Sequence, residues 1–315
     1  MTPIALTCGE PAGIGPEIAV TAWETLGKSV PFVWVGDPRH LPPQTPYVEL
    51  SAPTEDPGDR FPVLSHRFAS AAVPGSPDPA HAQGVIDVIK RGVDLVRDGA
   101  CSALCTAPIN KKALIDGAGF AFPGHTEFLA HLADVSRVVM MLASQQLRVV
   151  PATIHIPVSD VPSALTPDVL RETLAITAAG LRDHFGISLP RIAVAGLNPH
   201  AGEGGAMGRE ELDWIAPLLK DLEIDAIITG PHPADTLFHV EARTRYDAAV
   251  AMYHDQALIP IKTLDFDRGV NVTLGLPFVR TSPDHGTALD IAGQGRASAT
   301  SLIEALRLAR QMAGK

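Results

Sequence analysis

The chain of 315 residues carries a formal net charge of −10, with 46% hydrophobic and 19% charged residues. These proportions are typical of a folded globular protein and exclude a disordered chain, and the length favours more than one domain. Lysines and arginines form no long run, so we expect no nucleic-acid surface, because phosphate-backbone binding requires clustered cations.

No apolar stretch reaches the roughly 18 residues that a membrane-spanning helix needs. The N-terminal residues have no basic region and no small-residue cleavage site after an apolar run, so we expect no signal peptide and a cytoplasmic location. Cys8, Cys101 and Cys105 have no CxxC spacing, which favours structural thiols over a zinc or redox site. The sequence therefore predicts a small-molecule ligand, with no nucleic-acid or membrane partner.

Apolar strand patterns alternate with helical patterns along the whole chain. Helices are expected at residues 16–26 and 81–97, and another begins at Thr166, a capping residue that is followed by Pro167. The expected strands cover residues 3–7, 30–35, 103–105, 138–142, 152–156, 192–195, 226–228, 248–252 and 270–274. This alternation predicts an α/β fold whose mostly parallel sheet is covered on both faces.

Proline-rich stretches interrupt the N-terminal part at residues 41–46, 52–62 and 73–79. Proline removes a donor from the ladder of a sheet, so these stretches are expected to be surface excursions. The chain has no internal repeat and no long linker. This predicts two domains with an extensive contact, and a cleft between them as the ligand site.

The first loop after a strand, residues 8–17, is glycine-rich and opens a helix, as a dinucleotide-binding turn does. Its glycines follow the spacing GxxxGxG rather than GxGxxG, and no Gly-Lys-Ser/Thr follows for a P-loop. A rigid structural turn is therefore favoured over a phosphate cradle.

Two further loops place hydroxyl and basic groups beyond strand ends, where ligands bind in open α/β sheets. Thr106 precedes Lys111 and Lys112, which either meet an anion or are solvated at a helix start. His125 and Thr126 open a helix whose free N–H groups favour an anion, although Thr126 can also serve simply as the N-cap.

Three histidines follow three different expected strands. His155 ends the strand at 152–156, His200 follows 192–195, and His254 follows 248–252. Three imidazoles with an open position suit a catalytic divalent ion, and Asp235 and Asp255 are candidate ligands or hydrogen-bond partners of the ligands. The separations match no compact metal motif, so a structural role for each histidine remains the alternative.

Basic residues gather around the last expected strand. Arg268 and Arg280 can bind phosphate or carboxylate through a fork, while Lys262 acts as a point charge. In a chain of net charge −10, this cluster predicts an anion site, with solvated basic residues as the alternative. Residues 284–293 are expected to form a histidine-glycine turn that opens a helix.

Six segments, in this order, resemble the 4-hydroxythreonine-4-phosphate dehydrogenase family of pyridoxal phosphate biosynthesis. They are GEPAGIGPE (9–17), PGHTEF (123–128), GLNPHAGEGG (196–205), PADTLF (233–238), AMYHDQ (251–256) and GVNVTLGLPFVRTSPDHGTALDIAG (269–293). Ala107 replaces a glycine that many members carry, and residues 41–79 match weakly.

The resemblance implies two α/β/α domains with a central cleft, like isocitrate and isopropylmalate dehydrogenases and unlike a Rossmann fold. We expect one domain of residues 1–130 plus 281–315, a second of residues 131–280, and the active site between them. The resemblance also implies a homodimer with an active site that is shared across the interface.

By the matching motifs, His155, His200 and His254 bind one divalent metal (zinc, magnesium or cobalt), with His254 contributed by the partner subunit. The residues implied to bind the phosphorylated substrate are His125, Thr126, Lys262, Asn271 and Arg280. Those implied to bind NAD(P) are Asn198, Gly202, Glu203, Gly204, Leu274, Asp284, His285 and Asp290. The candidate general bases are Lys262 and Asp255, with a metal-bound water as their rival.

The implied reaction is oxidation of 4-phosphooxy-L-threonine to a 3-keto acid that decarboxylates to 3-amino-1-hydroxyacetone phosphate (3-amino-2-oxopropyl phosphate). A divalent ion acidifies the substrate hydroxyl and stabilises the enolate, and the nicotinamide accepts the hydride. A paralogous dehydrogenase of a 4-phosphorylated threonate or erythronate uses the same parts. A metal-dependent hydrolase or aldolase and a non-catalytic phosphate-ligand sensor are more remote alternatives.

Overall fold

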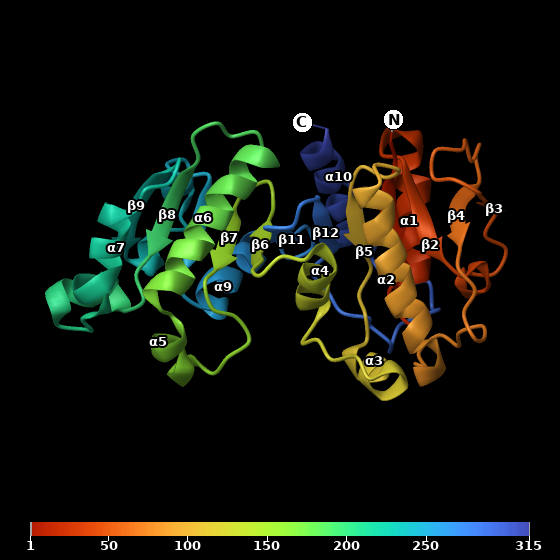
Figure 1. Cartoon of the computed structure of the whole chain (residues 1–315), viewed down its shortest axis with the longest axis horizontal. Coiled ribbons are helices and arrows are strands. Elements are labelled where there is room, and N and C mark those ends of the chain that lie inside the picture. Colours follow the sequence, from red (N-terminus) through yellow and green to blue (C-terminus); the bar gives the residue numbers. More distant parts are fainter. Residues whose placement is uncertain (1, 315) are drawn as a thin grey trace. The chain divides into compact units, whose positions relative to one another are not determined.

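The computed structural model describes residues 2–314, and the chain separates into two compact units (Figure 1). Residues 2–136 and 276–314 form the first unit, and residues 137–275 form the second. Both units are α/β, which confirms the predicted fold class. No helix within the described residues is long and apolar enough to cross a membrane.

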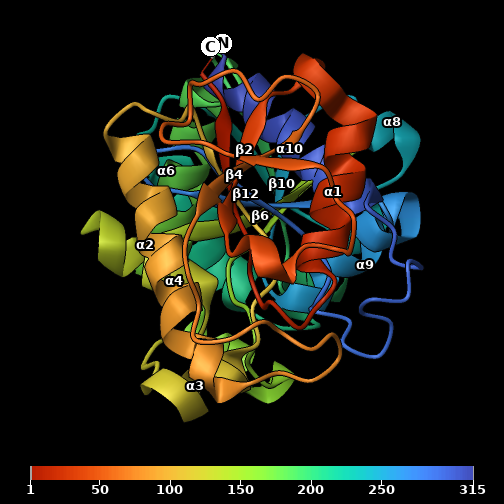
Figure 2. The ribbon, with the colours of Figure 1, turned by 90° about the vertical axis from the view of Figure 1, so that its right-hand side faces the viewer.

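The first unit is built on a parallel sheet with the order β3-β4-β2-β1-β5-β12. Its strands are β1 (Ile4–Thr7), β2 (Phe32–Gly36), β3 (Tyr47–Glu49), β4 (Phe61–Ser65), β5 (Leu104–Thr106) and β12 (Arg280–Pro283). Its helices are α1 (Gly15–Leu26), α2 (Ala82–Arg97), α3 (Lys111–Ala118), α4 (His125–Ala133) and α10 (Thr300–Ala313). Figure 2 shows α1 and α10 on one side of these strands and α2 with α4 on the other. The fully buried strand β1 therefore lies in the middle of the layers.

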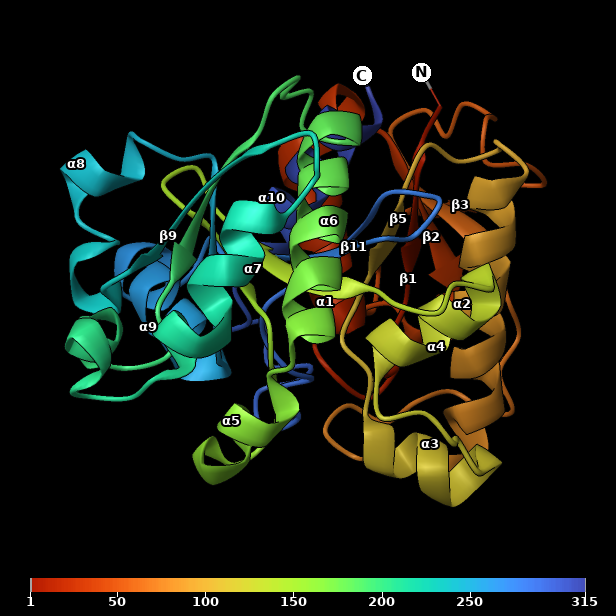
Figure 3. The same ribbon diagram turned by 60° about the vertical axis from the view of Figure 1, so that its left-hand side comes forward.

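The second unit has a mixed sheet with the order β11-β6-β7-β10-β8-β9, in which β6 runs antiparallel to both of its neighbours. Its strands are β6 (Val139–Ala143), β7 (Arg148–Pro151), β8 (Arg191–Ala195), β9 (Ile227–His232), β10 (Ala248–Ala251) and β11 (Val270–Leu274). Its helices are α5 (Val161–Ala164), α6 (Pro167–Asp183), α7 (Ala216–Asp221), α8 (Val240–Arg243) and α9 (His254–Asp265). Helix α9 packs on β7 and β10, and α6 packs on β6 and β11 (Figure 3).

Alternation along β10 explains this layering, because neighbouring side chains of a strand point to opposite faces. Ala249 and Ala251 join the buried cluster that contains Ala257 and Ile261 of α9, whereas Val250 between them is not part of that cluster. Helix α6 begins where the sequence predicts, and the Thr166 hydroxyl accepts a hydrogen bond from the N–H of Val169 at 3.3 Å.

Three of the expectations for local structure are wrong. The strand expected at residues 152–156 is β7, which ends at Pro151, and at His155 the backbone turns away with φ of +52°. The loop expected at residues 52–62 ends inside β4. Pro62 fits there because pairing of β4 with β2 begins only at Val63, so its missing N–H leaves no gap in that ladder. Residues 284–293 form turns rather than a helix, and Ala288 and Gly293 have positive φ, which a right-handed helix excludes.

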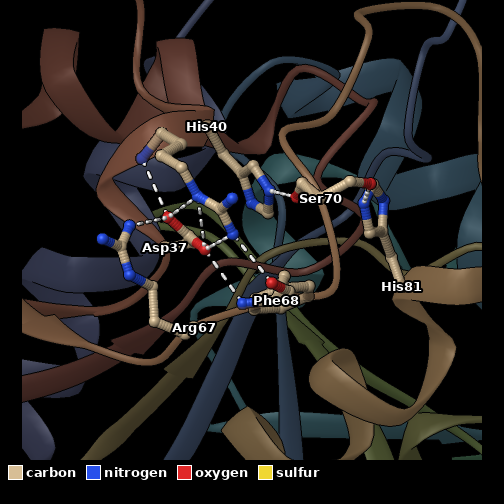
Figure 4. A network of polar contacts seen from close by, with 7 residues as sticks. Asp37, His40, Arg67, Phe68, Ser70 and His81 are labelled. Carbon is tan, nitrogen blue, oxygen red and sulfur yellow. Dashed lines mark hydrogen bonds and ion pairs between the residues drawn. The ribbon is translucent and has the colours of Figure 1, made fainter.

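A buried polar network holds the loops after β2 and β4 in the first unit (Figure 4). The Asp37 carboxylate is 0% exposed and accepts hydrogen bonds from the Arg39 guanidinium at 2.7 Å and from the N–H of Phe68 at 2.9 Å. Nearby, His40 donates to the carbonyl of Ser70 at 3.1 Å, and the Ser70 hydroxyl bonds His81 at 2.9 Å. This network fixes the chain at the carboxyl end of the parallel strands.

Candidate active site

A buried arginine and a hydroxyl meet at adjacent strands of the first unit. Strand β12 pairs with β5, and Nη2 of Arg280 donates to Oγ1 of Thr106 at 2.7 Å. Arg280 is 3% exposed, and burial lowers its pKa to about 10, so the guanidinium still carries its charge at neutral pH. A buried positive charge favours a bound anion, because the anion offsets part of the free-energy cost of removing the charge from water.

The helix α4 presents an imidazole near the same guanidinium. Burial, and after it the charge of Arg280, holds the pKa of His125 well below its ordinary value, so the ring is neutral. Its Nε2 is buried and has no hydrogen-bond partner among the described residues. The N-cap of α4 is Gly124, so the alternative in which Thr126 serves as N-cap is wrong. His125 and Thr126 are instead the first two residues of the helix, where N–H groups favour anions.

The lysine pair that follows Thr106 does not share this burial. Lys111 and Lys112 are exposed at the start of α3, where the Asn110 side chain accepts from the N–H of Ala113 as the N-cap. Nζ of Lys112 binds Asp116 of the same helix at 2.6 Å. Their geometry favours the alternative of solvated lysines at a helix start.

In the second unit, His155 and His254 lie side by side. They follow the neighbouring strands β7 and β10, and their ring centroids are 5.7 Å apart. Both line a cavity of about 390 Å³ with Tyr253 and Asp255. Nδ1 of His254 lies 2.7 Å from Oδ1 of Asp255. A carboxylate at Nδ1 holds the proton there and leaves Nε2 with its lone pair, the usual arrangement of a metal-binding histidine.

The third histidine lies in a separate loop of this unit. His200 is in η5 (Pro199–Gly205), and its Nδ1 lies 3.0 Å from Oε2 of Glu203, again leaving Nε2 for another partner. Across residues 2–314 no three histidine, cysteine or acidic side chains are grouped as a metal site. The free Nε2 atoms of these histidines fit a metal. Of the three rings, those of His155 and His254 are the two that lie side by side within the described chain. Asp235 lines a neighbouring cavity of about 440 Å³ that Asp255 also borders.

The backbone around His200 is left-handed over several residues. His200, Ala201 and Glu203 have φ of +55°, +51° and +44°, and glycines 202, 204 and 205 are also positive. A left-handed conformation costs a residue with a side chain roughly 1–2 kcal/mol. Neighbouring groups must therefore hold the loop. Asn198 is one of them, since its Nδ2 donates to Glu210 at 2.7 Å and to Glu211 at 2.9 Å.

Sequence reasoning missed three residues that hold these loops, namely Glu210, Glu211 and Gln256. Oε1 of Gln256 accepts from the N–H of Met252 at 2.7 Å, and its Nε2 donates to the carbonyl of Gly196 at 2.8 Å. Gln256 lies in the quoted AMYHDQ segment, which is the one signal that could have found it. Glu210 and Glu211 lie outside every quoted segment.

The other candidate residues are spread over both units. Lys262 lies in α9, with Nζ 5.8 Å from the ring centroid of Phe266, and Asn271 lies in β11. Leu274 at the end of β11 is fully buried and packs against Gly180 of α6, which places it in the core. In the first unit, Asp284, His285 and Asp290 lie in the turns after β12, and Nε2 of His285 is buried without a partner among the described residues.

Fold and site together define a two-unit α/β protein in which a buried arginine lies near a buried neutral histidine, and two further histidines lie side by side. Residues 31–309 match the family described as pyridoxal phosphate biosynthetic protein PdxA. The chain is 67% identical over 314 residues to 4-hydroxythreonine-4-phosphate dehydrogenase of Ruegeria sp. (strain TM1040), covering 98% of this chain and 96% of that protein. It is 64% identical to the protein of the same name from Roseobacter denitrificans, covering 99% and 98%.

A crystal structure of 4-hydroxythreonine-4-phosphate dehydrogenase from Klebsiella pneumoniae has a similar fold. It matches with a TM-score of 0.92 at 38% identity, covering 100% of this chain and 98% of that chain. The chain therefore belongs to the PdxA family.

Proposed function

We propose that the chain catalyses NAD(P)-dependent oxidation of 4-phosphooxy-L-threonine to a 3-keto acid that decarboxylates to 3-amino-1-hydroxyacetone phosphate, a step of pyridoxal 5'-phosphate biosynthesis. Family membership supports this reaction, because relatives 67% and 64% identical are named for the dehydrogenase. The observation in the structure that carries the proposal is the buried Arg280 beside neutral His125 at the start of α4. This pair suits the phosphate of such a substrate.

The substrate phosphate is bound by Arg280, His125 and Thr126 of the first unit. Arginine offers a planar fork of donors, and the neutral His125 offers a hydrogen bond rather than a second charge. As the resemblance implies, Lys262 and Asn271 offer the substrate an ammonium group and an amide. Each of these five side chains can thus donate a hydrogen bond to the substrate.

His155 and His254 are two of the three metal ligands in this proposal. Because these two lie together in one chain and His200 does not join them, a second copy of the chain supplies His200 and completes the site in a homodimer. This exchanges the roles expected from the resemblance, in which His254 came from the partner. Three imidazoles favour zinc or cobalt over magnesium, which prefers oxygen ligands. A bound divalent ion supplies Lewis-acid stabilisation of the charge that develops on the substrate oxygen.

Lys262 is the better candidate for the general base, because the Asp255 carboxylate already bonds Nδ1 of His254. The nicotinamide accepts the hydride, and the chain orients it. We assign its binding to Gly202, Gly204, Asp284, His285 and Asp290. Glu203 and Asn198 instead hold His200 and its loop, and Leu274 belongs to the core. A cytoplasmic location stays a prediction.

The proposal is tested by NADH or NADPH formation with dialysed, metal-restored protein. The substrates are 4-phosphooxy-L-threonine, its unphosphorylated form, and the 4-phosphates of threonate and erythronate. We expect turnover of the first only, with release of carbon dioxide. Reduction with a threonate or erythronate phosphate alone would assign the chain to the paralogous reaction, and no reduction with any of them would refute a dehydrogenase.

A further inference from the structure

The loop that carries His200 is folded around one buried carboxylate, that of Glu211. This residue is 3% exposed and opens the π-helical turn η6 (Glu211–Ile215). Its Oε1 accepts a hydrogen bond from the N–H of Asn198 at 2.8 Å, and its Oε2 accepts one from Nδ2 of the same residue at 2.9 Å. Glu211 therefore binds both the backbone and the side chain at the entry to the loop.

Glycines of the loop pack directly against this pair. A Cβ added to Gly202 would lie 2.8 Å from Oε2 of Glu211, and one added to Gly196 would lie 3.2 Å from Oε1. A Cβ on Gly208 would lie 2.3 Å from the Asn198 amide. The backbone before, within and after the left-handed segment thus contacts the Glu211–Asn198 pair, with no space for a side chain between them.

We propose that Glu211 is a positioning residue that fixes His200 in the orientation in which it binds a divalent metal. The left-handed conformations of His200, Ala201 and Glu203 are disfavoured by themselves, so they persist only because surrounding contacts hold them. Glu211 provides two of these contacts, with the N–H and Nδ2 of Asn198, and it packs closely against Gly202 within the loop. The inference rests on the proposed metal role of His200.

The decisive variant is Glu211→Gln. Glutamine keeps the shape of the side chain but replaces one acceptor with an NH₂ group, which then faces a donor of Asn198. The matched control is Asp213→Asn, on the same π-helical turn, where the exposed carboxylate binds Arg209 at 2.7 Å. Two quantities are measured: hydrogen–deuterium exchange of residues 196–208, and the affinity and visible absorption spectrum of bound Co²⁺.

In Glu211→Gln we expect exchange across residues 196–208 to accelerate at least about 10-fold, while β8 stays protected. We expect the Kd for Co²⁺ to rise about 10–100-fold, as when an outer contact of a metal ligand is lost. The Co²⁺ spectrum should also change, because the ligand geometry changes. Asp213→Asn should match the unaltered protein in every readout.

A Glu211→Gln protein that only melts at a lower temperature, with unchanged loop exchange, Co²⁺ affinity and spectrum, would overturn the inference. If the variant does not fold, Asn198→Ala removes the side-chain donor and keeps the backbone bond, and the same readouts decide. His200→Ala separates the two proposals. If it binds Co²⁺ as tightly as the unaltered protein, the metal role of His200 fails, and with it the inference, whatever the exchange of the loop.

Discussion

The side chain of Gln256 donates to the carbonyl of Gly196 at 2.8 Å, and this bond joins two histidine-bearing loops. Gln256 lies two residues after His254, while Gly196 begins the loop of His200. The carbonyl of the same side chain accepts from the N–H of Met252, the residue that follows β10, at 2.7 Å. One amide therefore sets the spacing between the two loops within the second unit.

Replacing Gln256 with Glu should loosen this connection, because a carboxylate cannot donate to the Gly196 carbonyl and brings two acceptors together. We expect the free energy of unfolding to fall by about 1–3 kcal/mol. The Kd for a divalent metal should rise about 10-fold. Gln145→Glu, an exposed position in the same unit, is the control. Equal metal affinity and urea midpoint in both variants would show that the bond is dispensable.

The sequence predicted the α/β fold class and the positions of most strands, because buried parallel strands read as short apolar runs between glycine and proline turns. Apolar residues continue past the end of β7 at Ala152, Ile154 and Ile156, so the strand was predicted too late. The antiparallel direction of β6 could not be predicted, because the pattern of apolar residues is the same for either strand direction. Pairing of β7 with β10, which brings His155 to His254, depends on sheet order and could not be read from loops alone.

Among the candidate site residues, His125 and Arg280 could be predicted from their motifs, but their burial could not. Glu211 and Gln256, which hold the histidine-bearing loops in place, belong to no pattern in the sequence that would mark them as structural. Their roles follow only from tertiary contacts with Asn198 and Gly196, which lie 13 and 60 positions away along the chain.

Arg280→Lys should raise KM for the phosphorylated substrate on the order of 10–100-fold, because lysine keeps a charge but loses the planar fork. KM for NAD(P) should stay unchanged. Arg307→Lys, on the exposed face of α10, is the matched control. Steady-state kinetics with each substrate varied in turn measure both constants. An unaltered KM for the phosphorylated substrate would exclude Arg280 from phosphate binding.

Asp37→Asn should destabilise the first unit by about 2 kcal/mol at neutral pH, because the carboxylate accepts charge-assisted bonds. Burial opposes its charge, but bonds from Arg39 and from the N–H of Phe68 outweigh burial and hold the pKa of Asp37 far below its ordinary value of 3.8. The stability that this carboxylate contributes is fully present above that value and is lost as the pH falls below it.

The difference in urea midpoint between the unaltered protein and Asp37→Asn should therefore be full at pH 7 and shrink below about pH 4. Asp94→Asn, exposed on α2, should behave as the unaltered protein does. A difference that is independent of pH would mean that the charge of Asp37 contributes nothing.

Mixed dimers test which histidines share a chain. If His155 and His254 come from one copy and His200 from the other, mixing His200→Ala with His254→Ala subunits restores one intact site per mixed dimer. Equal mixing should recover about a quarter of the unaltered activity, since half of the dimers are mixed. Mixing His155→Ala with His254→Ala should recover none. Complementation in both mixtures would return His254 to the partner subunit.

The central claim concerns the substrate, and the ratio of kcat/KM for 4-phosphooxy-L-threonine to that for its unphosphorylated form tests it most directly. NAD(P)H formation and release of 3-amino-1-hydroxyacetone phosphate are followed in the metal-restored protein. We expect the phosphorylated form to be favoured on the order of 100-fold or more, since the loss of charged hydrogen bonds alone accounts for such a factor. Equal values for the two forms, or oxidation without this product, would contradict the account.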